Sequence, residues 1–197
     1  MSMFINQNHK REPVKARSLS LGMTIALCGA SFISFNAFSA SQNTIRFQGE
    51  VNAQTCNVNV NDATGSPIIL LPTVSTTALS TAKSTAGKTP FTINLTGCVA
   101  PASGSTQAIN INLVGNNISS TGDLLNTGTA KNVALRLLDS SDKAIDLSGG
   151  AATVSGMTLA SGSTSASQNF SVEYYSDSGS AGAGTVLSSV QYSVSYP

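Results

Sequence analysis

Apolar and polar residues alternate with a period of two along the chain after position 40, and this pattern most constrains what the chain can fold into. The clearest stretch is Val186–Tyr196. Side chains of a strand point alternately to its two faces, so this stretch would carry an apolar face. That face comprises Val186, Ser188, Val190, Tyr192, Val194 and Tyr196, and the opposite face comprises Ser189, Gln191, Ser193 and Ser195.

The same alternation predicts a series of short strands. They are Thr44–Val51, Thr55–Val60, Pro67–Pro72, Pro90–Thr96, Ala108–Val114, Lys131–Leu138, Lys143–Leu147, Asn169–Tyr175 and Val186–Tyr196. Clusters rich in Gly, Ser, Asn and Asp separate most of them, which is typical of a β-sandwich or barrel. Ser75–Lys88 is polar and rich in Ser, Thr and Ala, so it is predicted to be an exposed loop or a short helix.

The first 40 residues are predicted to be a secretory signal peptide. Four basic residues precede the apolar, uncharged stretch Leu19–Phe38, and small residues supply a cleavage site after Ala40 or Ser39. An uncleaved membrane anchor is the alternative, disfavoured by the Ser, Gly and Asn residues that interrupt the stretch. Lipoprotein processing at Cys28 is disfavoured because Leu27 precedes it, where a small residue is needed.

Export would leave six basic and eight acidic residues, which predicts no nucleic-acid partner. The only histidine, His9, leaves with the signal, so no imidazole remains for acid–base chemistry or for a metal, and no cofactor is predicted. Two cysteines remain, Cys56 and Cys98. In an oxidising compartment they are expected to form a disulfide, and their spacing does not match a redox-active CxxC pair.

Other polar residues admit two interpretations each. Three acidic residues near 139–146 lack the spacing of a calcium loop, and Asp139 and Asp142 are expected to flank a solvated hairpin turn. No Gly-x-Ser-x-Gly elbow is present, although a Ser–Lys pair stays open as a catalytic alternative. The tyrosines could form a sugar-binding platform, but Tyr192 and Tyr196 fall on the apolar face and are expected in the core.

Thr44–Val51 is predicted to be a strand with one apolar face, at the free N-terminal end of the exported chain. Its alternate residues Ile45, Phe47, Gly49 and Val51 would point to one side. Such a strand either completes the sheet of its own molecule or is offered to another molecule.

Together these elements resemble the type 1 pilus subunit family of the chaperone–usher pathway, over essentially the whole region after the signal. The resemblance rests on the leader before Cys56, on Phe91–Cys98, on Val133–Asp139 and on the terminal strand. Two finer features agree with the family pattern. The family pattern has a tyrosine next to last and a glycine fourteen residues from the end, and Tyr196 and Gly184 occupy those positions.

The resemblance implies an all-β fold: an incomplete immunoglobulin-like sandwich that lacks its final strand, which a donor strand from another subunit supplies. The donor residues would be Asn43, Ile45, Phe47, Gly49 and Val51. The groove strand that faces the chaperone or the donor would comprise Gly184, Val186, Val190, Tyr192, Val194, Tyr196 and Pro197. The family's chaperone binds the C-terminal carboxylate, which here belongs to Pro197, a residue without a backbone N–H.

The resemblance therefore predicts a signal peptide at 1–40, a donor-strand extension at 41–52 and a pilin domain at 53–197. The expected function is structural: a pilus subunit that polymerises head-to-tail, supports cell adhesion and catalyses nothing. The expected partners are other pilus subunits, a periplasmic chaperone and an outer-membrane usher, and the expected location is the fimbrium on the cell surface. Alternatives are a minor adaptor or tip-proximal subunit with a binding role, a tip adhesin, for which the chain is short, and a secreted enzyme.

Overall fold

The structure is a computed structural model and describes Gln54 and residues 56–197. Its elements are β1 (Asn57–Val60), the 3-10 helix η1 (Thr76–Leu79), β2 (Ser84–Thr96), β3 (Gln107–Gly115), β4 (Leu124–Leu125), β5 (Ala134–Leu138), β6 (Ala151–Leu159), β7 (Ala166–Ser176) and β8 (Val190–Ser195). The predicted signal peptide and donor extension lie outside the described residues and stay predictions.

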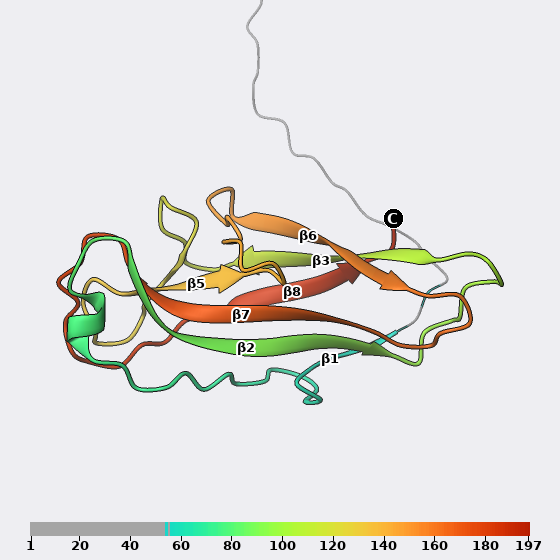
Figure 1. Ribbon diagram of the computed structural model, residues 1–197, viewed down its shortest axis with the longest axis horizontal. Coiled ribbons are helices and arrows are strands. Elements are labelled where there is room, and N and C mark those ends of the chain that lie inside the picture. Colours follow the sequence, from blue (N-terminus) through green and yellow to red (C-terminus); the bar gives the residue numbers. More distant parts are fainter. Residues whose placement is uncertain (1–53, 55) are drawn as a thin grey trace, which may run out of the picture. The chain divides into compact units, whose positions relative to one another are not determined.

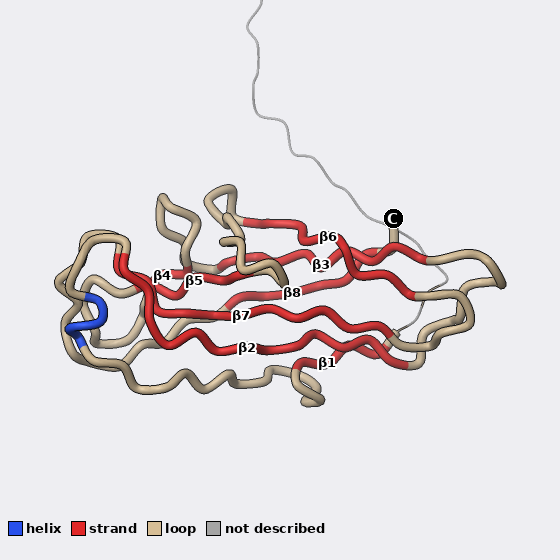
Figure 2. The backbone as a smooth tube through the Cα atoms, viewed as in Figure 1, coloured by secondary structure: helices blue, strands red, loops and turns tan. Residues whose placement is uncertain are grey.

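The strands form two sheets, and Figure 1 labels most of their members, which run roughly along the long axis of the view. One sheet has five strands in the order β1-β2-β7-β5-β4, and the other has three in the order β6-β3-β8. Every strand pair is antiparallel. Figure 2 shows loops at both ends of these sheets and β8 running beside β3. The predicted all-β sandwich is confirmed.

The core lies between the two sheets, where the inward faces of the alternating strands meet. Its fully buried side chains include Ile93, Leu95, Ile109, Ile111, Leu159 and Phe170. The rings of Phe91 and Phe170 on the neighbouring strands β2 and β7 are stacked, with centroids 5.6 Å apart. Large apolar side chains buried this fully each stabilise the fold by about 1.5–3 kcal/mol.

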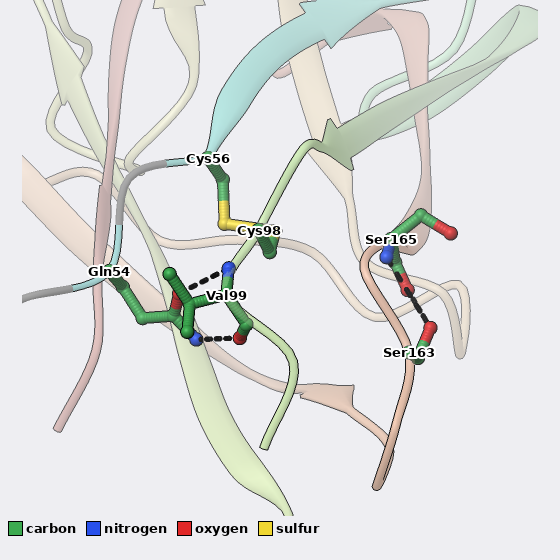
Figure 3. The surroundings of a disulfide bond; sticks show 6 residues. All are labelled: Gln54, Cys56, Cys98, Val99, Ser163 and Ser165. Carbon is green, nitrogen blue, oxygen red and sulfur yellow. Dashed lines mark hydrogen bonds between the residues drawn. A yellow bond between two sulfur atoms is a disulfide. The ribbon is translucent and has the colours of Figure 1, made fainter.

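The predicted disulfide is present between Cys56 and Cys98 (Figure 3), and it joins the chain just before β1 to the chain just after β2. Beside it, the Gln54 side chain donates from Nε2 to the Val99 carbonyl (2.8 Å) and accepts at Oε1 from the Val99 N–H (2.9 Å). Among the described residues β1 pairs with β2 alone, so this covalent link and these hydrogen bonds hold the edge of the five-stranded sheet in place.

Several predicted strand boundaries are wrong. The strand predicted from Pro90 begins at Ser84, inside the predicted loop, and the one predicted from Val186 begins at Val190. Residues 143–147 form no strand; the turn at Asp139–Asp142 is present, but only an isolated bridge joins Leu138 to Ala144. The terminal strand is shorter because the residues before Val190 bond to loop residues instead of to β3.

The strand β6 escaped prediction because its alternation is interrupted. Ala152 and Val154 point to the core, and after an extra residue Met157 and Leu159 do so. The pairing with β3 shifts at this point, and Gly156 has a φ of 108°, a conformation open mainly to glycine. This is a β-bulge, which moves the inward residues out of a strict period of two.

Candidate functional site

The most distinctive feature of the surface is an apolar groove along β8. It has a volume of about 740 Å³. One wall is β8, and the other is formed by β1 and the segment that follows it, while β2 and β3 contribute floor residues. The lining residues include Val58, Val60, Ile69, Phe91, Ile93, Leu113, Val190, Tyr192 and Val194, and no residue along this groove is charged.

A second hollow of about 440 Å³ continues the groove past the start of β8. Its walls are residues 73–76 with Leu79 on one side and residues 181–187 on the other, and its lining again contains no charged residue. Val186 lies here, and Gly184 lies beside it. The two hollows therefore follow the chain from Gly184 to Val194, where the sequence predicted an apolar face.

The five apolar side chains predicted on this face pack against the core, from β8 and from the residues on either side of it. Val186, Val190, Tyr192, Val194 and Tyr196 are each partly buried there. Their partial burial indicates that this side of the sandwich is open, because a further strand between the sheets would cover these side chains. Of the predicted groove residues, Val190, Tyr192 and Val194 lie on β8, whereas Gly184 and Val186 precede it and Tyr196 and Pro197 follow it. The backbone oxygen of Pro197 accepts a hydrogen bond from Gln107 Nε2, 3.1 Å away.

The opposite wall contains a segment predicted to be a strand, Pro67–Pro72. Its side chains alternate as predicted: Ile69 and Leu71 pack against the core, whereas Ile68 and Leu70 are each 83% exposed. The segment nevertheless belongs to no sheet. The physical reason is that a strand requires a neighbour, and the neighbouring position here is the groove itself.

The groove's backbone is as important as its side chains. Within the described residues β8 pairs with β3 alone, so its other edge has no strand beside it. About half of the N–H and C=O groups of a strand point toward each side, and such an edge is a template for a further strand. The groove can therefore offer apolar pockets and hydrogen-bonding groups to one extended peptide.

A third hollow, of about 320 Å³, differs from the other two because charged residues line it, namely Asp123, Lys131 and Asp177. Asp123 and Tyr175, which also lines the hollow, both contact Arg136. Arg136 donates from Nε to Asp123 Oδ1 (2.7 Å) and from Nη2 to Oδ2 (3.1 Å), and its guanidinium lies 3.4 Å from the centre of the Tyr175 ring. Hydrogen bonding to Asp123 raises the pKa of Arg136, and burial raises the pKa of Tyr175. None of the three residues of this cluster, Asp123, Arg136 and Tyr175, lines the groove.

Catalytic and metal-binding arrangements find no support in the part of the chain that the structure describes. No group of three or more His, Cys, Asp or Glu side chains is placed there to hold a metal ion. Helices long and apolar enough to cross a membrane are also absent among these residues. The lysines available for a Ser–Lys pair are Lys83, Lys88, Lys131 and Lys143. Of these, Lys88 forms an ion pair with Asp142.

The immunoglobulin-like sandwich is the fold of solved chaperone–usher pilus subunits. The structure is similar to the P pilus rod subunit PapA, with a TM-score of 0.51 at 14% identity over 72% of this chain and 99% of that one. It is also similar to a subunit of a chaperone–usher pilus structure that addresses rod uncoiling, with a TM-score of 0.53 at 13% identity over 80% and 97% of the two chains. At these identities the likeness concerns the fold.

Sequence comparison places the chain within this class. Residues 45–197 match the family described as fimbrial protein. The chain is 36% identical over 168 residues to the F17 fimbrial protein of Escherichia coli, covering 83% of this chain and 92% of that one. It is also 36% identical to the major fimbrial subunit SMF-1 of Stenotrophomonas maltophilia, over 81% and 95% of the two chains.

The chain therefore belongs to the fimbrial protein family. It is a subunit of a cell-surface fimbrium, and as a structural subunit it is not an enzyme.

Proposed function

We propose that this subunit builds the shaft of a fimbrium by polymerising head-to-tail through donor-strand exchange. The observation that supports the proposal is the open groove along β8, whose walls are extended chain on both sides. An incoming strand would bond to the free edge of β8 on one side and to the segment 67–72 on the other. A shaft role is favoured over that of a minor adaptor because one relative is named a major fimbrial subunit.

The proposed donor is the N-terminal extension of another copy, with Asn43, Ile45, Phe47, Gly49 and Val51 directed into its neighbour's groove. Apolar side chains in the groove would fix the register, because a slip by one residue turns them away from the pockets. A groove filled by a different molecule gives a contact that does not close on itself, and such contacts produce filaments.

The same groove would need protection before assembly, since an exposed apolar edge promotes aggregation. We therefore include in the proposal a periplasmic chaperone that covers the groove during transit and an outer-membrane usher that receives the subunit. Tyr196 packs against the core just after the terminal strand, at the end of the chain segment that the chaperone would cover.

Deleting residues 41–51 behind an intact signal peptide tests the proposal. The truncated subunit is expected to be exported and to bind the chaperone, but not to enter a neighbour's groove. Electrophoresis without boiling, which retains strand-exchanged polymers, measures the result. Normal polymers from the truncated chain would refute donor-strand exchange through this segment.

A point substitution refines the test. Phe47→Asp would place a charge in an apolar pocket and is expected to abolish polymers while leaving the fold of the subunit intact. Gln48→Asp is the matched control, because alternation puts residue 48 on the opposite face of the predicted strand. Equal loss of polymers in both variants would show that the face of the strand does not matter.

A further inference from the structure

The segment that precedes β8 is held in place by the loop between β4 and β5. Residues 126–131 run beside residues 182–187 and bond to them repeatedly. The Thr127 N–H donates to the Leu187 carbonyl (2.8 Å), and the Ala130 N–H donates to the Thr185 carbonyl (3.0 Å). These bonds lie next to the second hollow of the groove, which residues 181–187 line.

Asn126 is the centre of this contact, and its side chain takes part in four hydrogen bonds. Its Oδ1 accepts from the N–H groups of Gly128 (2.7 Å) and Leu187 (2.8 Å). Its Nδ2 donates to the carbonyls of Ala130 (2.9 Å) and Thr185 (3.3 Å). One half-buried amide thus bonds to both the loop and the groove wall.

Two glycines allow the loop and the wall to lie so close. A Cβ on Gly128 would lie 2.2 Å from the Thr185 carbonyl oxygen, and one on Gly184 would lie 2.4 Å from the Ala130 nitrogen. Both distances are far below a van der Waals contact, so a side chain at either position would push the two backbones apart. Gly184, predicted as part of the groove strand, thus contacts the loop.

The direction of the backbone groups follows from these bonds. Thr185 and Leu187 each give both their N–H and their C=O to the loop, the Thr185 N–H bonding to Thr129 Oγ1 at 2.9 Å. In an extended chain the next residue turns its groups to the opposite side. The N–H and C=O of Val186 therefore point away from the loop and toward the groove.

We propose that Asn126 is a positioning residue for strand insertion: it fixes residues 184–187 in the extended form that presents the Val186 backbone to the incoming strand. The inference rests on the proposed function, because a strand must enter this groove for the wall to matter. Loss of the Asn126 amide would leave the core intact but loosen this end of the groove. The donor strand would then be held well along β8 and poorly beside Val186.

Hydrogen exchange in assembled filaments of the full-length subunit tests this role. The Asn126→Ala variant is expected to exchange at least tenfold faster at the Val186 amide, with β3 and β7 unchanged. Asn126→Asp, which keeps the acceptor and loses the donor, is expected to give an intermediate effect. Leu147→Ala, which removes a buried core side chain that takes no part in the Asn126 hydrogen bonds, controls for general destabilisation and should raise exchange throughout the domain.

Unchanged exchange at Val186 in both Asn126 variants would overturn the inference, as would a rise spread evenly over the domain as in Leu147→Ala. Failure of donor-strand exchange itself would look different. In that case the Val186 amide of wild-type filaments would be as unprotected as in the subunit that lacks residues 41–51.

Discussion

The two long sides of the sandwich differ in how the apolar space between the sheets is covered. On one side the connection from β5 to β6 crosses between the sheets and inserts Ile145 and Leu147, which are buried. On the other side no connection crosses between β1 and β8 within the described residues, and the groove remains. The comparison shows that the described fold is well packed except along one side, where no strand or connection covers the apolar groove.

The edge strands of the three-stranded sheet differ in the same sense. β6 carries a bulge at Gly156, a device that makes an edge a poor template for further pairing. β8 pairs with β3 in unbroken register from Val190 to Ser195. One edge is therefore guarded, whereas the other is regular and lies beside apolar pockets.

The largest effect is expected from removing the disulfide that holds β1 at the open side. The double variant Cys56→Ser, Cys98→Ser releases a constraint between residues 42 positions apart. It should lower the free energy of unfolding by about 4 kcal/mol. Chemical denaturation of the oxidised wild type and of the variant measures the difference. A loss below about 1 kcal/mol would mean that packing alone holds this wall.

Leu147→Ala and Ile69→Ala compare the two sides with one type of change. Leu147 is 1% exposed and seals the closed side, so its truncation should cost about 3 kcal/mol of stability. Ile69 is only partly buried beside the groove and should cost about 1 kcal/mol in the isolated subunit. In polymers the difference between the two stability costs should become smaller, because a donor strand would bury Ile69. Denaturation of subunits and of polymers checks both expectations, and equal costs in the isolated subunits would contradict the comparison.

Asp123→Asn tests the polar cluster at the closed side. The change removes the charge that pairs with Arg136, whose side chain is 20% exposed. Because the Arg136 guanidinium stays partly exposed to solvent, the substitution should lower the free energy of unfolding by about 2 kcal/mol, less than for a fully buried pair. Polymer formation should persist, because the cluster does not line the groove. A variant of wild-type stability would show that the ion pair contributes nothing net.

The smallest effect concerns Glu173, next to Arg136 on the paired strand β7. Burial raises the pKa of its carboxyl group, so the folded state binds a proton more tightly than the unfolded state. This contribution to stability is present at low pH and is lost as the pH rises through the folded-state pKa. Glu173→Gln should therefore raise stability at pH 7 by less than about 0.5 kcal/mol and have no such benefit at pH 3. Denaturation at both pH values measures this, and a larger benefit at pH 3 would reverse the assigned sign.

The sequence predicted the fold class and the core faces well because burial enforces a period of two. Val190, Tyr192 and Val194 were placed correctly for this reason, and Cys56 and Cys98 were paired because only two cysteines remain after export. Where pairing departs from regularity, prediction failed. The bulge at Gly156 concealed β6, and the segment 67–72 lacks the neighbour that would make it a strand.

Asn126 was missed for a different reason. Its role depends on contacts with residues 185–187, some sixty positions away in the sequence. The local signal, an Asn-Thr-Gly sequence at 126–128, indicates a turn and nothing more. Long-range hydrogen bonds of this kind have no periodic signature.

The most direct test of the central claim places a photoreactive phenylalanine analogue at position 47 in filaments assembled from a mixture of ¹⁴N-labelled and ¹⁵N-labelled subunits. Mass spectrometry of the cross-linked peptides then identifies both the contact and the copy that provides it. Donor-strand exchange predicts cross-links to the groove walls, at residues 58–69 or 186–194, including pairs that carry different labels. Cross-links only between equally labelled peptides, or to the guarded edge at 151–159, would contradict it.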